Sequence, residues 1–173
     1  PQVLSISSNN SYLSVASNSD GKTVAGWIDL ANDTVQVATL SFGGSWSSVS
    51  TITSSGGNKG NLQIGIDSLG NGFAVWEEFN LGEIVASQTS GGFGSSWSSP
   101  AVISSTGSNS TPSLAVDASG TAVVAWTELN NANVIASVYS SGSWSSPTTI
   151  SNTFSGYPKA GTSGSNNFIA WIS

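Results

Sequence analysis

Three carboxylates recur at one spacing along the chain. Asp29, Glu78 and Glu128 each stand two residues after a tryptophan. Carboxylates in such a row could hydrolyse a sugar as a pair, bind a ligand or cation through their oxygens, or simply cap solvated strand ends. We expect solvated strand ends, with ligand binding as the alternative.

The residue inventory removes most reaction chemistry. The sequence has no histidine, cysteine or arginine, which excludes Ser-His-Asp triads, thiolate nucleophiles, histidine metal sites and arginine clamps. A glycosidase with paired carboxylates is the one enzyme class left. Glu77 and Glu78 cannot form that pair themselves, because neighbours on a strand point to opposite faces. We therefore expect no enzyme, no catalytic residue, no metal and no cofactor.

A second row could bind sugars by stacking. Trp46, Trp97 and Trp144 each begin a Trp-Ser-Ser segment after a glycine-rich turn. Aromatic faces are good platforms for pyranose rings, but a large aromatic at the same place in every repeat is also what packing between repeats needs. Packing is the favoured interpretation for these three, and more strongly for Trp27, Trp76, Trp126 and Trp171, which lie inside apolar segments.

Charge limits the partners. Only 7% of the 173 residues are charged, and the net charge of −6 leaves three lysines as the only basic side chains. Three scattered lysines cannot build a nucleic-acid groove, and no apolar run reaches the roughly 20 residues that span a bilayer. We expect no nucleic acid, no membrane insertion, and a glycan or protein ligand. The serine-, threonine-, asparagine- and glycine-rich, cysteine-free composition resembles bacterial secreted and surface proteins, which implies an extracellular or cell-surface location.

The elements that position these residues recur as a unit. The tryptophans Trp27, Trp76, Trp126 and Trp171 are 49, 50 and 45 residues apart, and a period of about 48 residues is typical of repeat architectures. Short Val-, Ile-, Thr- and aromatic-rich segments bounded by turn residues predict four strands per unit. The predicted strands are 12–16, 23–29, 34–40 and 45–53; 61–67, 72–78, 83–89 and 96–104; 113–117, 121–128, 133–140 and 143–151; then 157–161 and 167–171.

Segments 73–76 and 122–126 are apolar at both odd and even positions. Both faces of these strands must then be covered by protein, as happens when four-stranded sheets pack radially as blades. The predicted fold is an all-β propeller of four-stranded antiparallel blades, either four-bladed or completed by another chain.

The unit resembles β-propeller repeats, and its first two strands are similar to blades of the NHL type. Leu114-Ala115-Val116-Asp117 followed by Gly120 carries that resemblance, and Ile64-Gly65-Ile66-Asp67 with Gly70 repeats it. The resemblance implies a blade whose first strand is innermost. It implies no binding residue, since the later strands of the NHL-type family do not have the Trp-Ser-Ser-Pro start found in this chain. Asp67 and Asp117 are expected to close their turns by accepting backbone amides. Sialidases are also propellers, but their arginine cluster cannot exist here.

The predicted units are a closing strand at 1–7, blades at 8–53, 54–104 and 105–151, and a partial blade at 152–173. An open stack would expose apolar faces and strand edges, so residues 3–7 must pair with the partial blade of the same chain or of another. We expect a non-enzymatic binding or scaffold module, with lectin-like carbohydrate binding as its specific form. The alternatives are a purely structural repeat that assembles with itself into a ring or filament, and, third, a carboxylate glycosidase.

Overall fold

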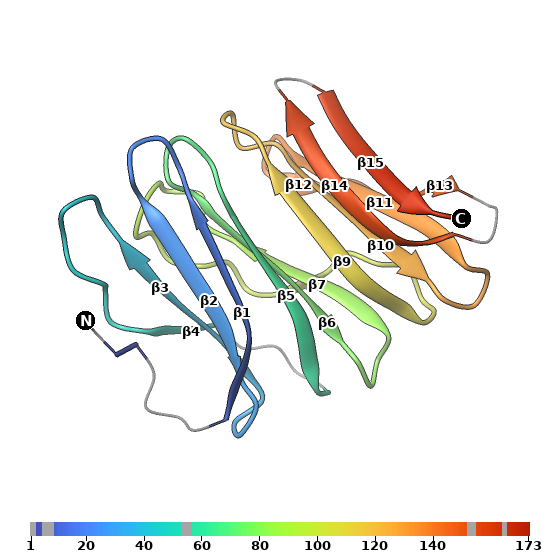
Figure 1. Cartoon of the computed structure of the whole chain (residues 1–173), viewed down its shortest axis with the longest axis horizontal. Helices are drawn as coiled ribbons and strands as arrows, with labels where there is room; N and C mark the ends of the chain where they lie inside the picture. The colour runs from blue at the N-terminus through green and yellow to red at the C-terminus, as the bar shows by residue number, and fades with distance from the viewer. Residues whose placement is uncertain (1–2, 5–8, 53–56, 152–154, 164–165) are drawn as a thin grey trace.

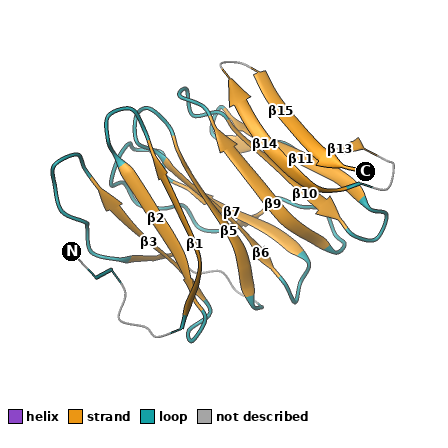
Figure 2. Cartoon of the chain, in the orientation of Figure 1, coloured by secondary structure: helices purple, strands orange, loops and turns teal. Residues whose placement is uncertain are grey.

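The computed structural model describes residues 3–4, 9–52, 57–151, 155–163 and 166–173. These residues form strands, turns and loops, and no helix occurs among them (Figure 2). In particular, none of the described residues form a helix long and apolar enough to cross a membrane.

The strands form three antiparallel meanders and a hairpin, in chain order. The first sheet is β1 (Asn10–Ser17), β2 (Thr23–Asp29), β3 (Thr34–Leu40) and β4 (Ser50–Ile52). The second sheet is β5 (Lys59–Ile66), β6 (Gly72–Glu78), β7 (Glu83–Gln88) and β8 (Ala101–Val102). The third sheet is β9 (Asn109–Val116), β10 (Ala122–Glu128) and β11 (Asn133–Ser140), with β12 (Ser143–Trp144) and β13 (Thr148–Ser151) both pairing with β11. The hairpin is β14 (Gly156–Ser163) and β15 (Asn166–Ile172). The predicted meanders are thus confirmed.

The fourth strand of each sheet is shorter than predicted. Of predicted strand 45–53, the described residues form a strand only at Ser50–Ile52. At the preceding Trp-Ser-Ser segment a serine hydroxyl takes over one ladder bond: the Thr39 amide donates to Ser47 Oγ at 3.0 Å, and the Val138 amide to Ser145 Oγ at 3.1 Å. Side-chain hydrogen bonds thus replace regular pairing at this outer edge.

The sheets lie side by side in one row, with the first sheet at one end and β14–β15 at the other (Figure 1). The first strands contact one another in sequence, β1 with β5, β5 with β9 and β9 with β14. The described sheets form an open row that does not return on itself (Figure 1). The two predicted ways of completing the fourth blade, within one chain or by another chain, both depend on residues 1–7 and stay predictions. Of the predicted closing strand 1–7, Val3 and Leu4 are not in a strand, and the rest lies outside the described residues.

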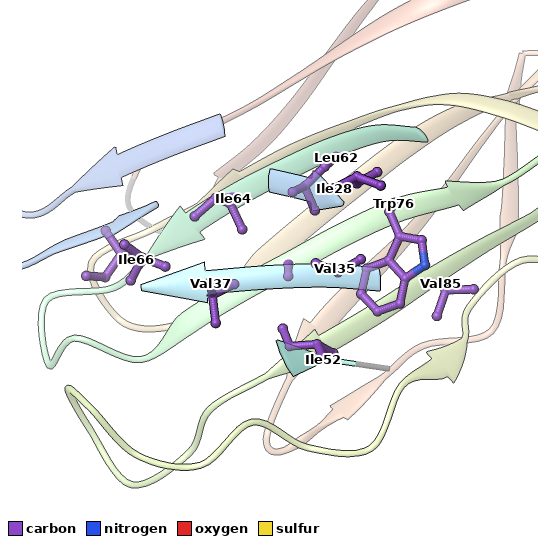
Figure 3. Close-up of a cluster of buried hydrophobic side chains, with 11 residues drawn as sticks. Ile28, Val35, Val37, Ile52, Leu62, Ile64, Ile66, Trp76 and Val85 are labelled. Atoms are coloured by element: carbon purple, nitrogen blue, oxygen red, sulfur yellow. The ribbon is translucent and has the colours of Figure 1, made fainter. Parts of the chain in front are cut away.

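Apolar side chains from both faces of the central strands fill the spaces between sheets. Between the first and second sheets lie Val24, Ile28, Val35, Val37, Ile52, Leu62, Ile64, Ile66, Ala74, Trp76 and Val85 (Figure 3). Between the second and third lie Val75, Ile84, Ala86, Ile103, Val124, Trp126 and Ile135. Trp76 and Val75 are neighbours on β6 and face opposite interfaces, as the double-sided apolar pattern predicts.

Candidate functional site

The predicted carboxylate row lies at equivalent strand ends. Asp29, Glu78 and Glu128 are the last residues of β2, β6 and β10, and each pairs with the first residue of the preceding strand in its sheet. All three side chains are buried. The expectation of solvated strand ends is therefore wrong: the following turn folds back over Asp29 and Glu128, and Trp76 and Lys59 enclose Glu78.

Two of these carboxylates hold their own turns together. Asp29 accepts the amide of Ala31 at 3.0 Å and the Asn32 side chain at 2.8 Å. Glu128 accepts the amides of Asn130 at 2.9 Å and Asn131 at 3.2 Å, and the Asn131 side chain at 2.9 Å. A carboxylate engaged with backbone donors in this way closes a turn. Their ligand role stays a prediction.

Glu78 belongs to a buried charged cluster that sequence reasoning missed. Its Oε1 accepts the indole N–H of Trp76 at 3.0 Å, and its Oε2 lies 3.7 Å from the ammonium of Lys59. Lys59 is itself buried and reaches across to Asp33 of the first sheet at 3.0 Å. A comparison of the repeats could have found it, because Lys59 occupies the position that Asn10 and Asn109 hold in the first and third sheets, opposite the strand-end carboxylate.

Two of the three Trp-Ser-Ser tryptophans lie between sheets. Trp97 packs against the core shared by the first and second sheets, close enough that a Cβ on Gly72 would lie 2.9 Å from its ring. Trp144 donates to Gln88 Oε1 of the second sheet at 3.4 Å and lies 5.4 Å from the ring of Tyr139. These contacts are the ones expected if the rings of Trp97 and Trp144 pack between repeats.

Trp46 differs because its sheet is at the end of the row. It forms an isolated bridge with Leu40 and is half-buried. No sheet precedes the first one among the described residues, so Trp46 has no equivalent of the Gln88 contact made by Trp144. Of the three, it is the one whose role as a ligand platform the packing leaves open.

Asp67 and Asp117 occupy the turns between first and second strands. Asp67 accepts the amide of Asn71 at 2.8 Å and its side chain at 2.6 Å. Asp117 accepts the amides of Ser119 at 2.8 Å and Thr121 at 2.9 Å. Burial alone would raise the pKa of Asp117, but hydrogen bonds from the Ser119 hydroxyl and the amides of Thr121, Ser119 and Gly120 more than offset it and lower the pKa. Within the described ranges, no three acidic side chains gather as a metal site would need.

Each first strand carries a bulge with a residue in the left-handed region. The residues are Tyr12, Asn61, Thr111 and Tyr157, with φ of 51 to 54°, and the register of each first strand shifts there. A non-glycine residue at positive φ costs free energy and persists only where its surroundings impose it. Sequence reasoning missed this feature, since the four residues share no side-chain type.

Side chains of the preceding sheet hold two of these bulges. Glu77 Oε2 accepts the amide of Thr111 at 3.0 Å and the hydroxyl of Ser110 at 3.1 Å. One sheet further on, Thr127 Oγ1 accepts the amide of Tyr157 at 3.1 Å. Thr127 also shares a hydroxyl hydrogen bond with Thr111 at 3.3 Å. The bulges therefore turn hydroxyl-bearing residues toward the junction of neighbouring sheets.

A cavity of about 390 Å³ opens at the junction of the third sheet with β14–β15. It is lined by Ser110, Thr111, Thr127, Leu129, Ala132, Ser155, Gly156, Tyr157, Ile172 and Ser173. Tyr157 is 70% exposed, so its ring stands open to a ligand. Hydroxyl groups, an exposed aromatic ring and side chains without charge suit a neutral, polyhydroxylated molecule.

Comparison with solved structures identifies the fold. A GH93 alpha-L-arabinofuranosidase of Fusarium graminearum, solved with arabinobiose, matches 92% of this chain and 55% of its own at 15% identity, with a TM-score of 0.59. The Hadza microbial sialidase Hz136 matches 89% of this chain and 40% of its own at 12% identity, with a TM-score of 0.57. The Aleuria aurantia lectin, in complex with alpha-methyl-L-fucoside, matches 99% of this chain and 74% of its own at 12% identity, with a TM-score of 0.45.

The fold is all-β and of the propeller type, with sheets as blades. The chain spans about half the length of the arabinofuranosidase and less of the sialidase. No protein-family model and no curated protein sequence matches the chain.

Proposed function

We propose that this chain is a non-enzymatic carbohydrate-binding module, and that the cavity between the third sheet and β14–β15 is its binding site. The observation that carries the proposal is the lining itself. Three hydroxyls, those of Ser110, Thr111 and Thr127, are held by hydrogen bonds beside the exposed ring of Tyr157. Hydroxyl groups both donate and accept, as sugar hydroxyls do, and the ring offers an apolar face for a pyranose.

The site is preorganised. The Glu77 carboxylate fixes the Ser110–Thr111 bulge, and Thr127 fixes the backbone at Tyr157. Little conformational entropy is then lost when a ligand binds. The arabinofuranosidase that shares the fold was solved with a sugar bound, which agrees with the proposal at the level of fold. A ligand of this kind is met outside the cell, and we extend the proposal to an extracellular or surface location.

A glycan array followed by calorimetry on each hit tests the proposal. Truncating Tyr157→Ala removes the stacking face, and we expect affinity to fall by about tenfold or more. Tyr12→Ala is the matched control, because Tyr12 holds the same bulge position in the first sheet at nearly the same φ and lies outside the cavity. Silence across the array, or equal binding by both variants, would contradict a glycan site here.

A glycosidase remains the competing assignment. The carboxylate beside the cavity is Glu77, and its Oε2 is engaged with Ser110, Thr111 and Asn61. Three donors on one oxygen support a role in holding the bulge rather than in proton transfer. The unmodified chain, Glu77→Gln and Glu128→Gln should therefore all hydrolyse aryl glycosides no faster than buffer alone. Hydrolysis by the unmodified chain that is lost in either variant would favour catalysis.

A further inference from the structure

The two ends of the row expose apolar side chains at positions that are buried inside it. In the first sheet Leu13 is 72% exposed and Val15 is 54% exposed. The bulge at Tyr12 aligns these residues with Leu62 and Ile64 of β5, which follow the bulge at Asn61 and are 3% and 8% exposed. The difference arises because β5 packs on the first sheet, whereas no described sheet packs on this side of β1.

The other end shows the same mismatch. Phe168 of β15 is 56% exposed, and its equivalent Phe73 on β6 is 2% exposed and packs edge-on against Tyr139 of the third sheet at 5.3 Å. The equivalence follows from the strand register, since Phe73 pairs with Gly65 and Phe168 pairs with Gly161.

The two glycines differ in what surrounds them. A Cβ on Gly65 would lie 2.3 Å from Val116 Cγ2, so glycine is needed there for the third sheet to approach. A Cβ on Gly161 would meet nothing within 4 Å, and its φ lies outside the left-handed region. Neither packing within the described residues nor backbone conformation requires glycine at 161, and glycine there leaves room for a further sheet to approach as closely as the third sheet approaches Gly65.

We propose that the outer face of β14–β15 binds the β1 face of a second copy of this chain, in the way the second sheet binds the third. Position 17 of the second copy would then meet Gly161, as Val116 meets Gly65, and Val15 would cover Phe168. The two faces differ and lie at opposite ends of the row (Figure 1), so the contact is head-to-tail rather than symmetric. The match covers 55% of the arabinofuranosidase chain, so two copies supply about the length of that chain.

This interface is independent of the proposed glycan site and can be tested by disulfide trapping. The chain has no cysteine, so introduced thiols are the only ones present. One chain carries Ser17→Cys, a second carries Gly161→Cys, and the two are mixed and mildly oxidised. We expect mixed disulfide dimers on non-reducing gels, in excess of the homodimers that each chain gives alone.

Two further experiments serve as positive and negative controls for disulfide formation. Gly65→Cys with Val116→Cys in one chain tests the geometry inside the row, because a Cβ on Gly65 would lie 3.3 Å from that of Val116, near the separation found in disulfides. Ser14→Cys mixed with Gly161→Cys is the off-face control, since Ser14 faces the second sheet and accepts the amide of Ile64. We expect an internal disulfide in the first and no mixed dimer in the second.

Association without introduced thiols gives an independent readout. Light scattering of the unmodified chain should show dimers or larger assemblies as concentration rises. Gly161→Val should keep the circular dichroism spectrum and weaken association by about tenfold or more, because its side chain would clash with the incoming sheet. Association of Gly161→Val as strong as that of the unmodified chain would overturn the proposal.

Two other outcomes would also overturn it. A disulfide within a single chain that carries both Ser17→Cys and Gly161→Cys would mean that the chain closes on itself. A monodisperse monomer at high concentration, with no mixed dimer, would mean that a second copy does not cover the ends, and would leave further sheets of a longer polypeptide as the occupant.

Discussion

The ammonium of Lys59 lies 3.0 Å from the carboxylate of Asp33, and the Lys59 amide donates to the same side chain at 3.0 Å. Asp33 belongs to the first sheet's turn and Lys59 begins the second sheet, so one residue pair ties two blades together. Lys59 is 1% exposed, and the buried carboxylate of Glu78 lies on its other side at 3.7 Å. The ammonium of this enclosed lysine thus lies between two carboxylates, one from each sheet.

Removing this lysine should destabilise the protein strongly. Lys59→Met leaves the buried Glu78 carboxylate without its cation, and we expect a loss of about 3 kcal/mol in the free energy of unfolding. The double variant Lys59→Met with Glu78→Gln removes both charges and should recover part of that loss. Urea unfolding followed by circular dichroism gives both free energies of unfolding. A double variant that is no more stable than Lys59→Met alone would show that the two charges do not interact.

The close approach of the second and third sheets predicts a second difference. Gly65→Ala places a methyl group against Val116 and Leu114, and overpacking of this kind costs about 1–3 kcal/mol. Gly161→Ala is the matched control, because a Cβ there meets nothing within 4 Å, and alanine should leave stability equal or raise it slightly. Thermal unfolding at dilute concentration, where the end faces are apart, measures both, and equal effects would contradict the assigned contact.

The sequence predicted the strands better than their arrangement. Thr23–Asp29, Gly72–Glu78 and Asn133–Ser140 were predicted at their observed bounds, because apolar residues at both odd and even positions and flanking turn residues mark strands buried on both faces. How the fourth blade is completed, by the same chain or by another, could not be predicted, since the angle between neighbouring sheets is set by packing at each interface and leaves no local pattern.

The candidate site depended on similar long-range contacts. The carboxylates Asp29, Glu78 and Glu128 were found from their spacing. Their burial follows from contacts that spacing does not show, turns that fold back on Asp29 and Glu128 and the Lys59 contact of Glu78. The cavity was missed because its hydroxyl residues, such as Thr111 and Tyr157, come from different repeats and are aligned by bulges at positive φ. No spacing rule marks a bulge whose central residue changes from repeat to repeat.

The Asp117 turn should make stability depend on pH in the acid range. The pKa of Asp117 lies below its ordinary value of 3.8 because the Ser119 hydroxyl and three backbone amides outweigh the effect of burial. The folded protein therefore holds the charged form more strongly than the unfolded chain does, and this stabilisation is present above pH 3.8 and lost as the pH falls through the folded pKa. Melting temperatures of the unmodified chain and Asp117→Ala should differ at pH 6 and converge toward about pH 2. A difference that does not change with pH would mean that the carboxylate charge contributes nothing.

The recurring tryptophans should contribute different amounts to the free energy of unfolding, depending on where their sheet lies in the row. Trp76 is fully buried between the first and second sheets and donates to Glu78, whereas Trp171, at the equivalent place in β15, is 39% exposed. Trp76→Ala opens a large cavity and leaves a buried carboxylate oxygen without its donor, so we expect a loss of about 3–5 kcal/mol. Trp171→Ala exposes less new apolar surface and should cost about 1–2 kcal/mol in the dilute chain. Circular dichroism in urea compares the two without relying on indole fluorescence. Equal losses would show that β15 is as firmly packed as β6, and that the end of the row is not open.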